Sequence, residues 1–171
     1  AHFGKTVLRD IGRSELIEAI PVLRQKAGDR AILRALHFLA ENDRVDAMLR
    51  AITENHGAKT GEERQKSIEA FLSLVNESGN SSWELLQNVF SVKSVTEQGP
   101  SLALAMTREF IRDLGCGACR VHGGGFAGTI QVYIPLESVA AYQAWMAGAF
   151  GEKAVTQLRI RPIGAAELHF E

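Results

Sequence analysis

Cysteine is scarce in this 171-residue chain, which contains only Cys116 and Cys119. A chain of this length buries roughly 70% of its unfolded surface, so it needs neither a disulfide nor a metal to fold. The Cys-x-x-Cys spacing suggests a redox pair, but such pairs normally precede a helix, and a strand is expected here. With His122 the two cysteines would supply three zinc ligands without an obvious fourth. We interpret them as small residues packed at the start of a strand, with a redox or metal role as the alternative.

Long apolar runs and clusters of one charge sign are also missing. The chain has 19 basic and 20 acidic residues, which give a formal net charge of −1. Because binding to a phosphate backbone needs a clustered basic face, nucleic acid is not expected as a partner. No apolar run approaches the roughly 20 residues that span a bilayer, and no signal-peptide pattern precedes the first expected element. We therefore expect a soluble, cytoplasmic protein without a membrane partner.

Glycine is abundant in one place, between two strand-like patterns in residues 118–134. The turn between them consists of Gly123, Gly124, Gly125, Phe126, Ala127 and Gly128. Glycine lacks a Cβ, so such a run can adopt positive φ and bring its N–H groups close to another backbone or to an anion. The glycine turn, residues 123–128, is therefore either a candidate phosphate site or merely a tight connection.

Two well-known glycine motifs do not fit this run. Gly123, Gly125 and Gly128 have the dinucleotide-binding spacing, but that motif requires a helix next, whose N-terminus holds the pyrophosphate. Residues 129–134 alternate and are partly β-branched, which predicts a strand instead. The P-loop spacing is also present, yet Thr129 stands where that loop needs a lysine. Both interpretations are excluded.

The glycine turn and the residues before it resemble the third motif of the GHMP kinases, and within them the galactokinases. The similar stretch, residues 117–129, reads Gly-Ala-Cys-Arg-Val-His-Gly-Gly-Gly-Phe-Ala-Gly-Thr. Upstream, residues 34–45 are similar to a helix bearing a Glu-Asn-Glu-Arg element, and residues 71–78 to a stretch ending in Met-Asn-Glu-Ser. The three blocks occur in the family's order. Ala127 is a departure, because the family commonly has glycine there.

The resemblance is to the C-terminal domain of a galactokinase only. The Pro-Gly-Arg-x-Asn-x-Ile-Gly-Glu-His block and the Gly-Leu-Ser-Ser-Ser phosphate loop of the N-terminal half are missing. The resemblance implies that the intact enzyme transfers the γ-phosphate of MgATP to the anomeric hydroxyl of galactose or a related hexose. The catalytic aspartate, the magnesium ligands and most sugar contacts would belong to an absent N-terminal kinase domain. Because the chain starts at Ala1 without methionine, we expect an excised piece whose partner is that domain. Alone it should be inactive and should bind no MgATP.

We expect one domain, residues 1–171, beginning with an extended lead-in, residues 1–13, that could form an edge strand. Residues 14–99 are mainly helical, and Pro21 should break the first helix. From residue 30 to about residue 55, apolar residues lie on two nearly opposite faces, so this helix should touch two layers or kink. A helix pair with one ordinary core is the alternative. Capping-box patterns predict new helices at Thr60 and Ser81, with Gly79 as the C-terminal cap between them.

Residues 100–171 are predicted to form a helix, two strands, a helix and two strands. The last two strands are residues 155–161 and 166–170, and Gly151 should end the helix before them. Helices on one face of a small, mostly antiparallel sheet make an α+β two-layer sandwich, here with an added helical layer. This order is consistent with the ferredoxin-like C-terminal domain of GHMP kinases, so the pattern and the resemblance agree.

Under the resemblance, the glycine turn would lie beside the triphosphate at an interdomain cleft. Arg120 and His122 would share a strand face and point to the mouth of that cleft. No catalytic residue is expected in this chain, because the family places its base in the other half, and no metal site is expected either. Asn76, Ser78 and Ser81 could project an amide or hydroxyls toward a ligand, or could cap helices. The alternative function is a stand-alone ferredoxin-like module that binds a small molecule or has a regulatory role.

Overall fold

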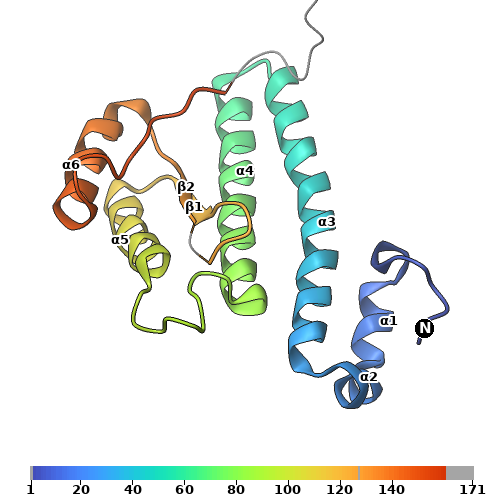
Figure 1. Cartoon of the computed structure of the whole chain (residues 1–171). Helices are drawn as coiled ribbons and strands as arrows, with labels where there is room; N and C mark the ends of the chain where they lie inside the picture. Colours follow the sequence, from blue (N-terminus) through green and yellow to red (C-terminus); the bar gives the residue numbers. More distant parts are fainter. Residues whose placement is uncertain (1, 127, 161–171) are drawn as a thin grey trace, which may run out of the picture. The chain divides into compact units, whose positions relative to one another are not determined.

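The structure is a computed structural model that describes residues 2–126 and 128–160 and divides into two units, Ala1–Ile134 and Pro135–Glu171 (Figure 1). The fold is α+β, as predicted, because helices predominate and the described residues include one sheet of two strands. None of the helices in the described part of the chain has the length and apolarity to cross a membrane.

The N-terminal segment is helical, and the predicted edge strand is wrong. Leu8–Asp10 form a short 3-10 helix, η1, that contacts the long helix α3 (Asp29–Gly57) and pairs with no strand of the described residues. Two short helices follow, α1 (Arg13–Glu18) and α2 (Ile20–Ala27). Pro21 lies in the first turn of α2, where its missing N–H costs nothing, so the predicted helix break is confirmed.

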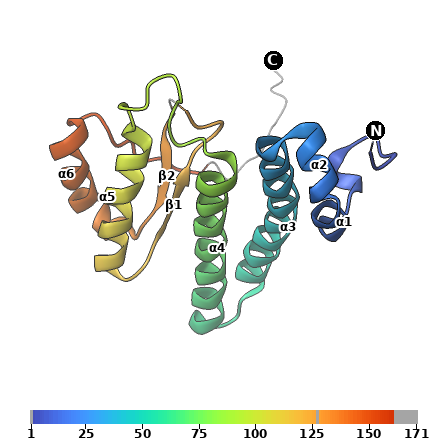
Figure 2. The ribbon, with the colours of Figure 1, turned by 90° about the horizontal axis from the view of Figure 1, so that it is seen from below.

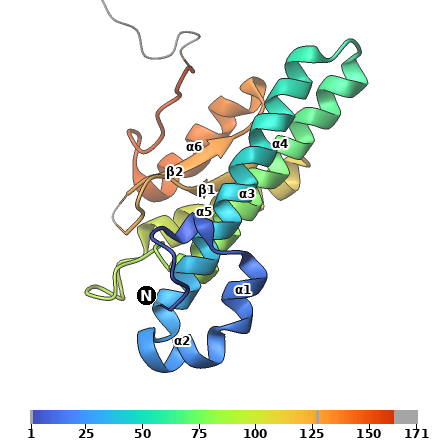
Figure 3. The ribbon, with the colours of Figure 1, turned by 90° about the vertical axis from the view of Figure 1, so that its right-hand side faces the viewer.

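Helix α3 packs beside α4 (Gly61–Ser81), and the two run next to each other along most of their length (Figure 3). The capping box predicted at Thr60 is confirmed. Glu63 N–H donates to Thr60 Oγ1 over 3.1 Å, and Thr60 N–H donates to Glu63 Oε2 over 3.2 Å. These two bonds satisfy backbone donors that the first turn of a helix leaves free.

Helix α3 is one continuous helix and buries only one of its two apolar faces. Ile32 and Leu39 are buried, whereas Val45 and Leu49 on the other face are 59% and 62% exposed. Ile52 continues this exposed face one turn further along. The helix therefore does not kink, and its second face, the α3 stripe formed by Val45, Leu49 and Ile52, lies open to solvent.

Helix α4 extends past the position where a helix end was predicted. Gly79 lies inside α4, and Ser81 caps nothing, because the chain continues directly into the π-helical segment η2 (Ser82–Leu86). A Cβ on Gly79 would lie 2.9 Å from the Cys119 carbonyl oxygen. Glycine is therefore required there because a strand passes close to the helix, and the C-cap interpretation is wrong.

The strand, turn and strand predicted around the glycine run are confirmed. Strands β1 (Ala118–Val121) and β2 (Ile130–Tyr133) pair antiparallel, with Ala118 opposite Tyr133 and Val121 opposite Ile130. Helix α5 (Gly99–Leu114) precedes them and ends at Gly115, whose φ of 78° is left-handed. Because a strand follows the glycine turn, the exclusion of a dinucleotide motif stands.

Helices lie on both faces of this sheet, not on one face as predicted (Figure 2). One face carries Cys119 and Val121, which form a buried cluster with Leu104 of α5 and with Val89. On the other face, the Phe71 ring of α4 lies 5.6 Å from the Tyr133 ring in an edge-to-face contact. The apolar side chains on the two faces of the strands are thus covered by different helices.

The second unit contains η3 (Leu136–Ser138) and α6 (Val139–Phe150), and α6 ends before Gly151 as predicted. Residues 155–160 have no regular structure, so the strand predicted there is wrong. Leu158 and Ile160 are 81% and 89% exposed, which shows that the alternating pattern buries no face. Arg161, the strand predicted at residues 166–170 and Ala127 lie outside the described residues.

Candidate functional site

The glycine turn joins the two strands at an exposed end of the hairpin. His122 N–H donates to the Thr129 carbonyl oxygen over 2.8 Å and closes the strand ladder at the base of the turn. Gly123 and Gly125 have φ of 63° and 75°, a left-handed conformation that favours glycine. Between described residues, no hydrogen bond engages the N–H groups of Gly123 and Gly124, and both residues are exposed. These two donors are available to an acceptor outside the chain.

Asn88, which follows η2, contacts the glycine turn at three positions. Its carbonyl oxygen accepts a hydrogen bond from Phe126 N–H over 2.6 Å. Its Nδ2 donates to the Gly124 carbonyl oxygen over 3.3 Å. Gly125 lies so close that an added Cβ would overlap the Asn88 carbonyl oxygen and lie 2.8 Å from Asn88 Cγ. Asn88 and the glycine turn therefore form one hydrogen-bonded unit.

Sequence reasoning missed Asn88. Asn88 is separated from Gly124 by 36 residues, so no local periodicity or capping pattern links them. The only local signal is that two polar residues, Gln87 and Asn88, stand between the apolar residues Leu86 and Val89. Asn88 is nevertheless only 4% exposed, which is unusual for a polar side chain without a special partner.

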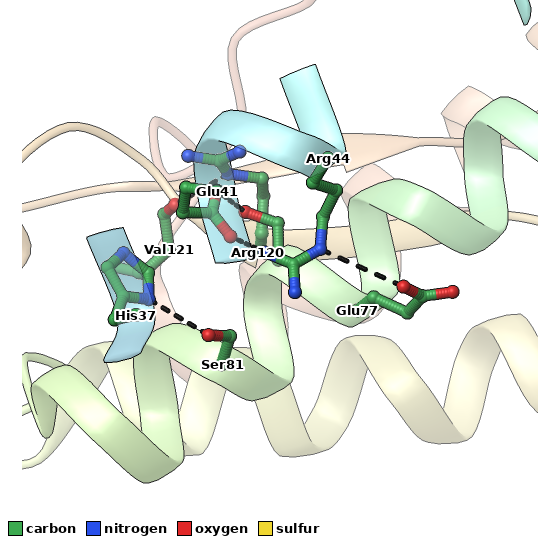
Figure 4. Close-up of polar contacts among 8 residues, drawn as sticks. His37, Glu41, Arg44, Glu77, Ser81, Arg120 and Val121 are labelled. Carbon is green, nitrogen blue, oxygen red and sulfur yellow. Dashed lines mark hydrogen bonds and ion pairs between the residues drawn. The ribbon is translucent and has the colours of Figure 1, made fainter. Parts of the chain in front are cut away.

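A second group of polar side chains lies between α3 and α4 (Figure 4). His37 Nδ1 and Ser81 Oγ are 2.9 Å apart, and Ser78 Oγ donates to Glu41 Oε2 over 2.7 Å. Arg44 forms an ion pair with Glu41, and its Nε lies 3.8 Å from Glu77 Oε2. His37, Glu41 and Arg44 recur at helical spacing on one face of α3, so a single face of that helix supplies half of the network.

The predicted ligand-facing serines lie inside this network. Ser78 and Ser81 are buried, and their hydroxyls are engaged by Glu41 and His37. Arg120 of β1 lies in the same group of side chains (Figure 4). The sequence allowed Ser78 and Ser81 to face a ligand or to cap helices, and the resemblance placed Arg120 at the mouth of a cleft. The structure places all three residues where α3, α4 and β1 meet.

Asn76 and His122 lie apart from that network. Asn76 Oδ1 accepts a hydrogen bond from Cys119 N–H over 3.0 Å, and its Nδ2 lies 3.4 Å from the Gly117 carbonyl oxygen. The amide thus bonds to backbone groups in β1 and just before it, and it protects this edge of the sheet. His122 follows β1 and is exposed. Arg120 is half-buried in the polar network, so the two residues differ in their exposure.

The two cysteines lie in different environments, and both have free thiols. Cys116 is exposed, whereas Cys119 is buried in the core cluster with Leu104 and Val121. Burial raises the pKa of the Cys119 thiol, which opposes formation of the reactive thiolate. Among residues 2–126 and 128–160, no three His, Cys, Asp or Glu side chains are grouped as metal ligands. The packing interpretation is confirmed for Cys119 and is wrong for Cys116, which is exposed.

Protonation of His37 is expected to destabilise the fold. Burial lowers the pKa of His37 below its usual 6.5, and the charges of Arg44 and Arg120 lower it further, against an opposing contribution from Ser81. The unfolded chain therefore binds this proton at a higher pH than the folded chain. The contribution to stability is complete above pH 6.5 and is lost as the pH falls through the lowered pKa.

Urea unfolding at about pH 8 and about pH 5.5 measures this effect. The wild type should lose more stability between the two pH values than His37→Gln, which keeps a hydrogen-bonding group opposite Ser81 but does not titrate. Equal losses in the two proteins would contradict the prediction.

Comparison of the chain with family models, with curated proteins and with solved structures found no match in any of the three.

Proposed function

We propose that this chain is the C-terminal part of a GHMP-type small-molecule kinase. The supporting observation is the glycine turn, which offers two unpaired N–H groups to solvent and is held from behind by Asn88. Within the class, we propose a galactokinase-type enzyme that transfers the γ-phosphate of ATP to the anomeric hydroxyl of galactose or a related hexose. The residues that resemble the galactokinase motifs support this narrower assignment.

The proposed role of the turn is electrostatic. Phosphoryl transfer needs positioned substrates and stabilisation of the negative charge that is spread over the transferred group. The N–H groups of Gly123 and Gly124 supply partial positive charge without a titratable group, and a rigid turn needs no reorganisation during the reaction. In this proposal MgATP is a substrate, and the turn contacts its phosphates or the loop that holds them. This chain contributes no catalytic base.

The partner in this proposal is an N-terminal kinase domain of the same protein. It would supply the catalytic aspartate, the magnesium ligands and most contacts to the sugar substrate. The α3 stripe is a surface available to such a domain, because Val45, Leu49 and Ile52 are exposed along one helix face. We propose a cytoplasmic location, where ATP and sugars are present together.

A Gly124→Val substitution in the complete protein tests the role of the turn. No described residue lies within 4 Å of a Cβ at Gly124, and its φ is outside the left-handed range, so the variant should fold. We expect galactose-dependent ADP release by the wild type and a loss of at least about tenfold in kcat/KM for ATP in the variant, because the branched side chain shields the two N–H groups. Gly57→Val is the matched control, since Gly57 ends α3 and its Cβ would also meet nothing.

Three outcomes would contradict this proposal. A complete protein that phosphorylates no hexose overturns the galactokinase assignment. If Gly124→Val had the same kcat/KM for ATP as the wild type, the proposed role of the turn would be wrong. Tight binding of a small metabolite to the 171-residue chain alone, measured by calorimetry, would favour the stand-alone binding module instead.

A further inference from the structure

We infer that Asn88 is a positioning residue, which holds the glycine turn in the shape that the proposed ATP site requires. The inference rests on the proposed function for its ligand, but the contact itself does not depend on that function. Asn88 reaches both sides of the turn, because its backbone oxygen accepts from Phe126 N–H and its side-chain amide donates to the Gly124 carbonyl oxygen. The Gly124 carbonyl follows the Gly123 and Gly124 N–H groups directly in the chain, so fixing that carbonyl and the Phe126 N–H restricts the direction in which the two donors point.

Backbone strain is concentrated at the same contact. Gln87 and Phe126, with φ of 54° and 64°, are the two non-glycine residues with positive φ in the described part of the chain. Gln87 directly precedes Asn88, and Phe126 N–H donates a hydrogen bond to the Asn88 carbonyl oxygen. Such conformations persist only where surrounding contacts compensate for them. Strain on both bonded segments indicates that the contact holds each of them in a conformation it would not adopt alone.

The Asn88 segment is also anchored in the core beneath the sheet. Val89 is 1% exposed and packs with Leu104, Cys119 and Val121. Ser101 Oγ of α5 lies 3.4 Å from the Val89 carbonyl oxygen. Cys119 and Val121 belong to β1, which leads into the turn, so the turn is fixed both through its own strand and through Asn88. Movement of the turn relative to the core must break the Asn88 contact.

The two side-chain atoms of Asn88 are not equivalent. Nδ2 donates to Gly124, whereas Oδ1 is buried and accepts no hydrogen bond from the described residues. Loss of an acceptor that has no partner costs little stability, but loss of the donor releases Gly124. Asn88→Leu keeps the branching and the number of heavy atoms of the side chain and removes both polar atoms, so it should remain folded while the turn loses its side-chain bond. The Asn88→Leu variant therefore distinguishes a role in positioning the turn from a role in stabilising the whole fold.

The first test measures amide hydrogen exchange of Phe126 in the 171-residue chain, which requires no enzymatic activity. In Asn88→Leu, we expect exchange at Phe126 to become at least about tenfold faster, because the turn opens more often. Exchange at Val121 should be unchanged. Asn80→Leu is the matched control, since Asn80 is an exposed asparagine bonded to Arg108. Unchanged exchange at Phe126 in Asn88→Leu would overturn the inference.

The second test measures the kinetics of the complete protein. We expect Asn88→Leu to raise KM for ATP about tenfold and to leave KM for the hexose unchanged, because only the nucleotide would contact the turn. Partial unfolding alone would instead lower the apparent kcat and leave both KM values unchanged. Unchanged KM for ATP overturns the positioning role. Faster exchange at Phe126 in a protein without kinase activity supports the contact and overturns the proposed function.

Discussion

Replacing Gly125 with alanine is expected to lower the free energy of unfolding by about 3 kcal/mol or more. Gly125 has φ of 75°, a left-handed conformation that costs an alanine energy. The added Cβ would also overlap the Asn88 carbonyl oxygen and lie 2.8 Å from Asn88 Nδ2. The overlapping atom belongs to the backbone, so no rotamer change relieves it. Urea unfolding of the two proteins measures the difference.

Gly124→Ala is the matched control for Gly125→Ala. Gly124 is the preceding residue of the same turn, but a Cβ there has no neighbour within 4 Å. We expect its stability to differ from the wild type by less than about 0.5 kcal/mol, as for an ordinary surface substitution. If both variants were equally stable, the close approach of Asn88 to the turn would be refuted.

Replacing Gly79 with leucine is expected to lower the free energy of unfolding by about 3 kcal/mol, although leucine is the better helix former. Helix propensity alone predicts a gain of about 1 kcal/mol inside α4. However, a Cβ on Gly79 would lie 2.9 Å from the Cys119 carbonyl oxygen and 3.3 Å from Arg120 Cα, both in β1. The rest of the side chain has no space between helix and strand, so α4 and β1 must separate.

The control for Gly79→Leu lies on the same helix. Gly61 is the first residue of α4, and a Cβ there has no neighbour within 4 Å. Gly61→Leu should therefore be neutral or slightly stabilising in the same urea experiment. A Gly79→Leu protein as stable as Gly61→Leu would show that α4 does not approach β1 as closely as the structure indicates.

Local sequence signals predicted the limits of several elements correctly. The Thr60 capping box, the helix end at Gly151, and the two strands around the glycine turn all agree with the structure. Each of these signals acts through backbone conformation or through hydrogen bonds between residues a few positions apart. Such interactions lie within a short stretch of sequence, so the residues of that stretch are enough to predict them.

The same local signals failed where a distant segment determines the residue. Gly79 resembles a helix stop by residue type. Glycine is required there, however, because Cys119 of β1, 40 residues later in the chain, packs against the helix. Residues 155–160 alternate like a strand, yet a strand also requires a neighbouring chain to bond, and none pairs with them among the described residues. The covering of both sheet faces likewise depends on where α4 and α5 pack.

In the candidate site, too, local features were predicted from the sequence and long-range contacts were not. The sequence alone identified the glycine turn, since glycine permits positive φ whatever the surroundings are. Only the tertiary structure revealed Asn88 behind the turn, and only it placed Ser78, Ser81 and Arg120 in a polar network with His37 and Glu41. These partners are separated by 36 to 44 residues along the chain where hydrogen bonds join them. Backbone freedom is a property of single residues, whereas a hydrogen-bond partner is fixed only when helices and strands have packed.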